Sequence, residues 1–244
     1  MVISTLEMAE AQERLVAAIA DMDDEAMQVE SRCTGWTRGH VLSHIARNAD
    51  GMVNLARWAQ AGEETPMYPS SEVRNREIEG GALRPAAQII ADVVATNERV
   101  LAAFGALEGR VAVDPAVAAF EVGLGAPPAA RPVPVRDLPY LRLQEVVVHH
   151  HDLDSGLRPR DWPRAYVHEA LTRVAAIMAG RVDDMPTLVA EDDDVVRTVT
   201  PEGADVTVRA PASALLVWLL GRSTDQDRAR MDVAGGDLPD LPAY

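Results

Sequence analysis

The chain has 244 residues, of which 48% are hydrophobic and 25% are charged, and its formal net charge at pH 7 is −15. This composition is typical of a globular protein and excludes a disordered, collagen-like or disulfide-framework chain. The acidic balance argues against nucleic acid or an anionic membrane as a partner. The one cysteine excludes an internal disulfide and a multi-cysteine zinc or iron–sulfur site.

Targeting signals are not evident in the sequence. The acidic, amphipathic N-terminus lacks the basic and apolar regions of a signal peptide, and no apolar run approaches the ~20 residues that span a bilayer. We therefore expect a cytoplasmic protein.

Hydrophobic residues at helical spacing predict four long helices in the first 155 residues. Thr37 is the expected cap of the second helix, and Pro85 opens the third. Loops of very unequal length join these helices, so we expect an antiparallel four-helix bundle with a long crossover. The four segments are residues 6–20, 37–61, 86–104 and 141–153.

The connections in this region have their own patterns. Residues 62–71, GEETPMYPSS, form a loop, and Ser70 or Ser71 caps a short polar helix that Gly80–Gly81 should end. Residues 109–139 contain six prolines, and we expect this stretch to be irregular.

The pattern changes after Gly156, where a polar, proline-containing linker leads into a mixture of helices and strand-like runs. The four acids at 191–194 are expected to form a hairpin turn, since they lack the glycine and ligand spacing of a calcium loop. The predicted fold class is therefore α+β with two domains, a helical bundle over 1–155 and a smaller α/β domain over 156–244. The second domain has predicted helices at 164–180 and 213–220, and strands at 187–190, 195–200, 206–209 and 231–233.

A metal site is the main chemical candidate in the bundle. Glu145 and His149 are four residues apart, so a helix places them on one face, where they can share a metal ion. A third ligand must come from another helix, and the helix with His40 and His44 is the candidate. Because those two histidines are themselves four apart, spacing does not choose between them. Two histidines and a glutamate suit zinc with an open fourth position, or another first-row divalent metal.

Two other residues have a structural and a functional reading. Cys33 could be a nucleophile, but its place beside Gly35 and Trp36 favours an inert residue in the turn before a helix. Arg222 follows Gly221 at a predicted helix end, where an arginine usually caps carbonyls but can also bind an anionic ligand. The sequence contains no glycine-rich phosphate loop and no nucleophile elbow.

Three segments together resemble the mycothiol-dependent maleylpyruvate isomerases, which belong to a larger group with a DinB-like, metal-binding four-helix bundle. The WTxxxxLxH pattern within the first segment is typical of the whole group, whereas the GEETPMY loop and the C-terminal arginine segment narrow the resemblance to the isomerases. The segments are GWTRGHVLSHIARNADGMVNLARWAQAGEETPMYPSSEVRNREI (Gly35–Ile78), LRLQEVVVHHHDL (Leu141–Leu153) and LLGRSTD (Leu219–Asp225).

The resemblance implies a zinc ion on His44, Glu145 and His149, and it selects His44 where spacing did not. It also implies a catalytic Arg222 and places a second family arginine at Arg74, a candidate contact to substrate or thiol. Mycothiol supplies the thiol in this family, so Cys33 is free to be structural.

The implied activity is the cis–trans isomerisation of maleylpyruvate to fumarylpyruvate, in gentisate-type aromatic degradation, by reversible thiolate addition. Two alternatives stay open at this point. One is a mycothiol S-transferase or related thiol-dependent isomerase acting on another electrophile, and the other is a non-catalytic metal-binding regulator. The partners expected are small molecules, namely substrate and mycothiol, and the chain is expected to be a monomer.

Overall fold

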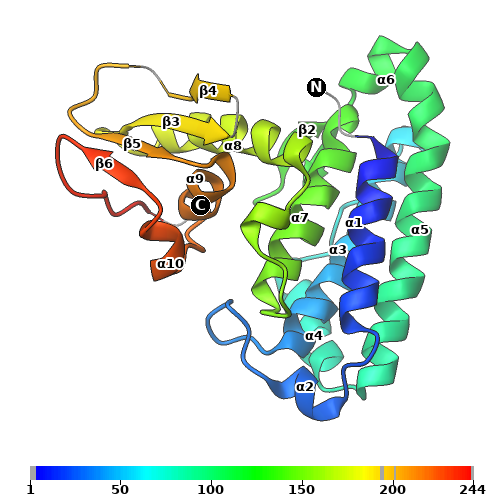
Figure 1. The fold of residues 1–244 in the computed structure, drawn as a ribbon. Coiled ribbons are helices and arrows are strands. Elements are labelled where there is room, and N and C mark those ends of the chain that lie inside the picture. The colour runs from blue at the N-terminus through cyan, green and yellow to red at the C-terminus, as the bar shows by residue number, and fades with distance from the viewer. Residues whose placement is uncertain (1–3, 193–194, 201, 243–244) are drawn as a thin grey trace. The chain divides into compact units, whose positions relative to one another are not determined.

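The computed structural model describes residues 4–192, 195–200 and 202–242 (Figure 1). The chain divides into two compact units, one ending at Gly156 and the other beginning at Leu157. In chain order, the first unit contains α1 (Thr5–Ile19), α2 (Asp24–Gln28), α3 (Arg38–Ala61), α4 (Ser71–Ala82), α5 (Ala86–Val113), α6 (Pro115–Ala119), β1 (Glu121–Leu124), β2 (Arg131–Pro134), the 3-10 turn η1 (Val135–Asp137) and α7 (Leu138–Asp152).

Four long helices of this unit form the predicted bundle. α1 packs against α5 and α7, and α3 packs against the same two helices (Figure 1). Each helix turns an apolar stripe inward, with Leu15, Ile45, Val93 and Val146 fully buried. Burying each such side chain contributes about 1.5–3 kcal/mol, so the interior faces hold the bundle together.

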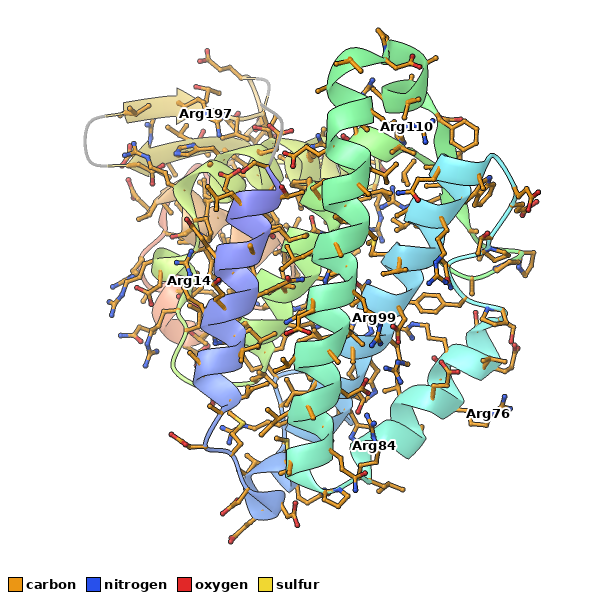
Figure 2. All side chains as sticks on the ribbon, turned by 90° about the vertical axis from the view of Figure 1, so that its right-hand side faces the viewer. Arg14, Arg76, Arg84, Arg99, Arg110 and Arg197 are labelled. Atoms are coloured by element: carbon orange, nitrogen blue, oxygen red, sulfur yellow. The ribbon has the colours of Figure 1, made fainter. Side chains whose placement is uncertain are left out.

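Helix starts follow the expected capping chemistry. The backbone N–H of Thr37 meets His40 Nδ1 at 3.2 Å at the start of α3, and the Ser70 hydroxyl accepts from the backbone of Val73 at 3.2 Å at the start of α4. Arginines on the outer faces pair with acids, as Arg99 does with Asp50 at 2.7 Å (Figure 2).

Two glycines lie where neighbouring segments pack closely against α3. α4 continues through Gly80 and Gly81 to Ala82, so the prediction that these glycines end the helix was wrong. A Cβ at Gly81 would lie 2.7 Å from Ser43 Oγ, and one at Gly51 would lie 2.7 Å from Met67 Cγ. The glycines therefore let α4 and the 62–71 loop approach α3 closely.

The expectation of an irregular stretch over residues 109–139 was wrong. α5 runs on to Val113 because no proline interrupts it before Pro115, which occupies the first turn of α6. β1 and β2 then form an antiparallel hairpin, in which Val122 pairs with Val133 and both side chains are buried. Its prolines fit because a two-stranded hairpin leaves outer N–H positions unused.

The second unit is built on a four-stranded sheet of order β4-β3-β5-β6, in which β3 and β5 are parallel and the other neighbouring pairs antiparallel. α9 packs against β3 and β5 and against α8. Leu188, Val208 and Leu216 are fully buried there. The elements are η2 (Pro159–Asp161), α8 (Arg164–Ala179), β3 (Thr187–Asp192), β4 (Val195–Thr198), β5 (Thr207–Ala210), α9 (Ala212–Leu219), α10 (Asp225–Arg228) and β6 (Asp232–Ala234).

These two units confirm the predicted α+β class, with a helical N-terminal region and a smaller C-terminal sheet region. Of the predicted acidic turn, Glu191 and Asp192 belong to β3, and residues 193–194 lie outside the described part of the chain. Across the residues described, no helix has both the length and the apolar character that crossing a membrane requires.

Candidate metal centre

Three candidate ligands from two helices meet inside the bundle. His44 lies on the buried face of α3, while Glu145 and His149 lie one turn apart on α7. His44 Nε2 is 2.9 Å from Glu145 Oε2, and His149 Nε2 is 3.6 Å from the same oxygen. One ligand atom from each residue lies within 4.8 Å of the other two. Ligand atoms about 2.1 Å from a tetrahedral metal are about 3.4 Å apart, so this spacing is close to that of a zinc site.

His40, the other histidine that spacing allowed, is engaged elsewhere. Its Nδ1 is 2.8 Å from Thr37 Oγ1 and its Nε2 is 3.2 Å from Glu79 Oε2. It therefore belongs to the start of α3 and its contact with α4. The structure brings His44, and not His40, to the pair on α7.

Burial and charge set complementary protonation states in the centre. Burial lowers the pKa of the His44 imidazole, and the Glu145 hydrogen bond only partly offsets this. Burial alone would raise the pKa of Glu145, but the His44 hydrogen bond and the nearby charges of His44, His149 and Arg142 hold it well below its usual range. A neutral imidazole beside a carboxylate is the state in which both groups bind metals.

Arg74, at the start of α4, lies directly against the centre. Its Nη2 is 3.0 Å from His44 Nδ1, and its guanidinium carbon is 5.6 Å from the centre of the Tyr68 ring. Tyr68 is buried, and burial, followed by the charge of Glu145, raises the pKa of its phenol to about 12. The 62–71 loop therefore contributes an uncharged phenol next to a cation, a residue that sequence reasoning placed only in a loop.

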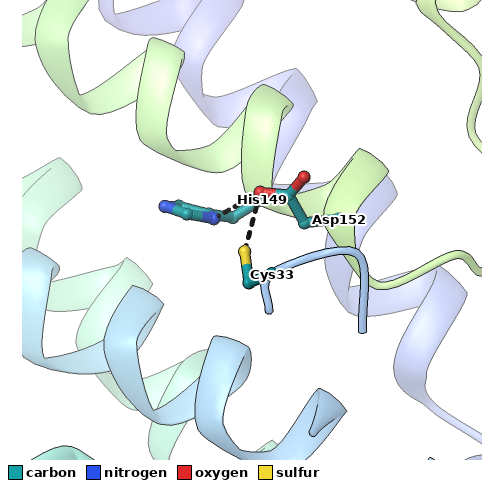
Figure 3. A group of neighbouring side chains, drawn as sticks. All are labelled: Cys33, His149 and Asp152. Carbon is teal, nitrogen blue, oxygen red and sulfur yellow. Dashed lines mark hydrogen bonds and ion pairs between the residues drawn. The ribbon is translucent and has the colours of Figure 1, made fainter. Parts of the chain in front are cut away.

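Asp152 and Cys33 form a second layer behind His149 (Figure 3). Asp152 Oδ2 is 2.9 Å from His149 Nδ1 and accepts a hydrogen bond of 3.2 Å from Cys33 Sγ. The same three residues also form a second group whose ligand atoms lie within 4.8 Å of one another. Sequence reasoning missed Asp152, although its place three residues after His149 on a helix was a usable signal.

Arg142 lies fully buried one turn before Glu145 and was also missed. Its guanidinium donates to the Ile45 carbonyl at 2.9 Å, to Asn48 Oδ1 at 2.8 Å and to Asn97 Oδ1 at 2.9 Å. Burial lowers the pKa of Arg142 to about 10, which still leaves it a cation at neutral pH. This fixed charge favours the carboxylate form of Glu145.

Arg222 belongs to the C-terminal unit, just after α9. Its Nη1 donates to the Leu220 carbonyl at 2.9 Å, and its backbone N–H donates to the Val217 carbonyl at 2.9 Å. The structural reading of this arginine, a helix-end cap, is therefore present. Gly221 has a φ of 71° and turns the chain there.

Comparison with known proteins shows to which family the chain belongs. The sequence model of the mycothiol maleylpyruvate isomerase N-terminal domain matches residues 8–154, and that of the MDMPI C-terminal domain matches residues 161–243. The chain belongs to the mycothiol-dependent maleylpyruvate isomerase family. The resemblance inferred from the sequence is confirmed, and the family is one of enzymes.

Solved structures extend the likeness to the fold. A crystal structure of the mycothiol-dependent maleylpyruvate isomerase superposes with a TM-score of 0.82 at 23% identity, covering 98% of this chain and 95% of that one. A mutant of that enzyme, with a histidine replaced by alanine, gives a TM-score of 0.81 with the same identity and coverage. No curated protein sequence matches the chain. At this identity the superpositions show that the fold is shared.

Proposed function

We propose that this protein is a mycothiol-dependent isomerase that converts maleylpyruvate to fumarylpyruvate at a zinc site in the N-terminal bundle. The observation that carries the proposal is the convergence of His44, Glu145 and His149 inside a chain of this family. The domains proposed for this activity are the metal-binding bundle, 1–155, and the α/β domain, 156–244.

The reaction needs a thiol that returns unchanged. Thiolate sulfur adds to one alkene carbon of the cis substrate, and the electron pair of the double bond moves onto the conjugated carbonyl as an enolate. The remaining carbon–carbon bond is single and rotates. The enolate then re-forms the alkene in the trans geometry as the carbon–sulfur bond breaks and releases the thiolate. No oxidant is consumed, and no protein nucleophile such as Cys33 is required because mycothiol supplies the sulfur.

The donor set of the centre fits zinc. Two uncharged imidazoles and one carboxylate are ligands that zinc accepts with a fourth position open, and their separations match its size. When bound, zinc would supply a Lewis acid that lowers the pKa of a thiol or polarises a substrate carbonyl. The His44 hydrogen bond, with the nearby charges of His44, His149 and Arg142, lowers the pKa of Glu145 and so favours the carboxylate form that such binding requires.

Arg74 is proposed to bind an anionic group of the substrate or the thiol cofactor. His44 can offer Nε2 to a metal only with its proton on Nδ1, and that proton excludes the hydrogen bond from Arg74. The guanidinium is then free to take a carboxylate in bidentate fashion. Arg222 is proposed as the catalytic arginine that neutralises a substrate carboxylate or the enolate.

Turnover of maleylpyruvate by zinc-loaded protein, with and without mycothiol, tests the proposal, with the product identified by chromatography. We expect fumarylpyruvate only when mycothiol is present. No turnover from protein that holds stoichiometric zinc would overturn the proposed substrate. Formation of a stable mycothiol adduct of another electrophile would then favour an S-transferase.

A further inference from the structure

The carboxylate behind His149 is the feature that the proposed mechanism leaves unused. Asp152 is fully buried at the last residue of α7. A carboxylate is disfavoured both by burial and by the partial negative charge at a helix C-terminus, so donors must compensate it. His149 Nδ1 at 2.9 Å and Cys33 Sγ at 3.2 Å are two such donors, and both meet the same oxygen, Oδ2 (Figure 3).

We propose that Asp152 is the positioning residue that fixes His149 as a metal ligand, and that Cys33 holds the Asp152 carboxylate in place as a thiol donor. The inference rests on the metal site of the proposed function. It assigns roles to two residues that touch neither the metal nor the substrate.

The Asp152 carboxylate decides which nitrogen of the His149 ring carries the proton. A carboxylate that accepts from Nδ1–H fixes the neutral tautomer whose lone pair is on Nε2. Nε2 is the atom that faces Glu145, at 3.6 Å from its Oε2. The ring is thereby held with Nε2 directed toward Glu145, which favours it as a metal ligand.

His44 provides an internal contrast. Its Nδ1 faces Arg74, which can only donate, so no carboxylate fixes its proton on that side. Of the two histidines, His149 is the one that is oriented in advance for a metal. Loss of Asp152 should therefore weaken metal binding through His149 alone.

Cys33 is anchored to the same helix end by its own chain segment. The neighbouring Arg32 donates its backbone N–H to the Asp152 carbonyl at 2.8 Å, and its guanidinium meets Asp154 at 2.6 Å. The thiol therefore reaches Asp152 from a fixed backbone. As an S–H donor to Oδ2 it completes the support of the carboxylate, whereas as a thiolate it would repel it.

Cys33, His149 and Asp152 could instead hold a metal themselves, since their ligand atoms lie within 4.8 Å. That arrangement would need the thiol and His149 Nδ1 to give up the protons that they share with Asp152. It would also take His149 away from Glu145 and His44 unless the ring bridged two ions. The hydrogen-bonded arrangement satisfies all three groups without that loss.

Metal affinity is the direct test, measured on the full chain by competition with a chromophoric chelator for zinc. Asp152→Asn keeps the size of the side chain and removes its charge, and we expect affinity to fall by about 10- to 100-fold. Asp21→Asn, at an exposed position of the same unit that makes none of the contacts described above, is the control and should bind zinc as the unmodified protein does. Affinity of Asp152→Asn equal to that of the control would overturn the proposal.

The role of Cys33 has its own pair of variants, which keeps the test decisive if Asp152→Asn does not fold. Cys33→Ser retains a hydrogen-bond donor and should keep the affinity, while Cys33→Ala should lose on the order of threefold. Equal affinity in both variants would remove Cys33 from the scheme.

Cobalt substitution separates a positioning thiol from a ligand. We expect the cobalt-loaded protein to show no thiolate-to-cobalt charge-transfer band, and a change of the visible band in Asp152→Asn that a purely structural residue would not cause. A charge-transfer band that disappears in Cys33→Ala would make Cys33 a ligand and overturn the proposal. Absence of any metal binding by the unmodified protein would overturn the zinc site of the proposed function as well, whereas binding with no effect of Asp152 overturns this inference alone.

Discussion

The interiors of the two units differ in chemistry. Among the residues that the structure describes, the C-terminal unit buries few polar side chains, namely Thr187, Thr200 and the polar tips of Trp162 and Tyr166. The bundle buries a larger set of titratable, amide and hydroxyl side chains. These are Gln12, Ser43, His44, Asn48, Thr96, Asn97, Arg142, His150, His151 and Asp152.

Polar groups in an interior destabilise a fold unless partners compensate them, so their concentration in one unit needs a cause. In the bundle, His44 is hydrogen-bonded to Glu145, and His149 lies between Glu145 and Asp152. The nearby charge of Arg142, which is itself bonded to Asn48, favours the carboxylate form of Glu145. The C-terminal unit achieves burial with Leu215, Leu216 and Val217 instead. The bundle interior is therefore organised around a site, and the C-terminal interior mainly around packing.

The largest effect expected is loss of the metal. His44→Ala should abolish stoichiometric zinc and lower turnover at least about 100-fold, because a bound metal contributes several kcal/mol of transition-state stabilisation. The bundle should stay folded, since a core of this size does not depend on one ion. Elemental analysis and circular dichroism measure the two properties.

His40→Ala is the matched control, one helical turn away on α3. It removes the contacts to Thr37 and Glu79 but none of the three proposed zinc ligands, so zinc content should be unchanged. Zinc retained by His44→Ala and lost by His40→Ala would reverse the assignment.

Removal of the buried cation tests whether the bundle interior is held together by its polar groups. Arg142→Leu leaves Asn48, Asn97 and the Ile45 carbonyl without their donor, and we expect a loss of about 3–5 kcal/mol in the free energy of unfolding. Arg99→Leu, on the outer face of α5, should cost less than about 1 kcal/mol. Urea unfolding compares the two, and an Arg142→Leu protein as stable as the control would contradict this role of the buried polar groups.

The sequence predicted those parts of the bundle that depend on local patterns. The positions of the long helices follow from hydrophobic spacing. Thr37 is the predicted N-cap of α3, and Ser70, one of the two candidates that the sequence left open, is the N-cap of α4. The alignment of Glu145 with His149 follows from helical geometry. The choice of His44 over His40, however, came from family resemblance.

The parts that could not be predicted depend on contacts between distant segments. Cys33 and Asp152 are 119 residues apart, and Arg142 meets Asn48 across 94 residues. No spacing rule within one helix brings such pairs together. The hairpin of β1 and β2 was missed because the many prolines in this stretch argued against regular structure. The two short strands around Val122 and Val133, which pair with each other, carry too few residues to show a strand pattern.

Arg222 tests whether the C-terminal unit takes part in catalysis. If that unit contributes chemistry as well as packing, Arg222→Ala should lower turnover by about 100-fold, as expected for removal of one group that stabilises developing negative charge. Zinc content should be unchanged. The exposed Arg230→Ala in the same unit is the control, and equal turnover in the two variants would rule out the catalytic role of Arg222.

The smallest effect expected is a pH dependence that only the bundle interior should produce. Burial, followed by the charges of Arg14 and His151, lowers the pKa of His150 to about 4 from 6.5. Between these values the unfolded chain binds a proton that the folded chain does not, so stability falls as the pH is lowered. From pH 6.5 to pH 5 the loss due to His150 is about 2 kcal/mol.

Chemical unfolding of metal-free protein at several pH values measures this loss. In His150→Gln the unfolding free energy should fall between pH 6.5 and pH 5 by that amount less than in the unmodified chain, because glutamine takes up no proton. His168→Gln, which removes a histidine of the C-terminal unit, is the control variant. Equal slopes in all three proteins would show that His150 is protonated in the folded bundle, and that this interior admits charge at His150 as readily as the surface does.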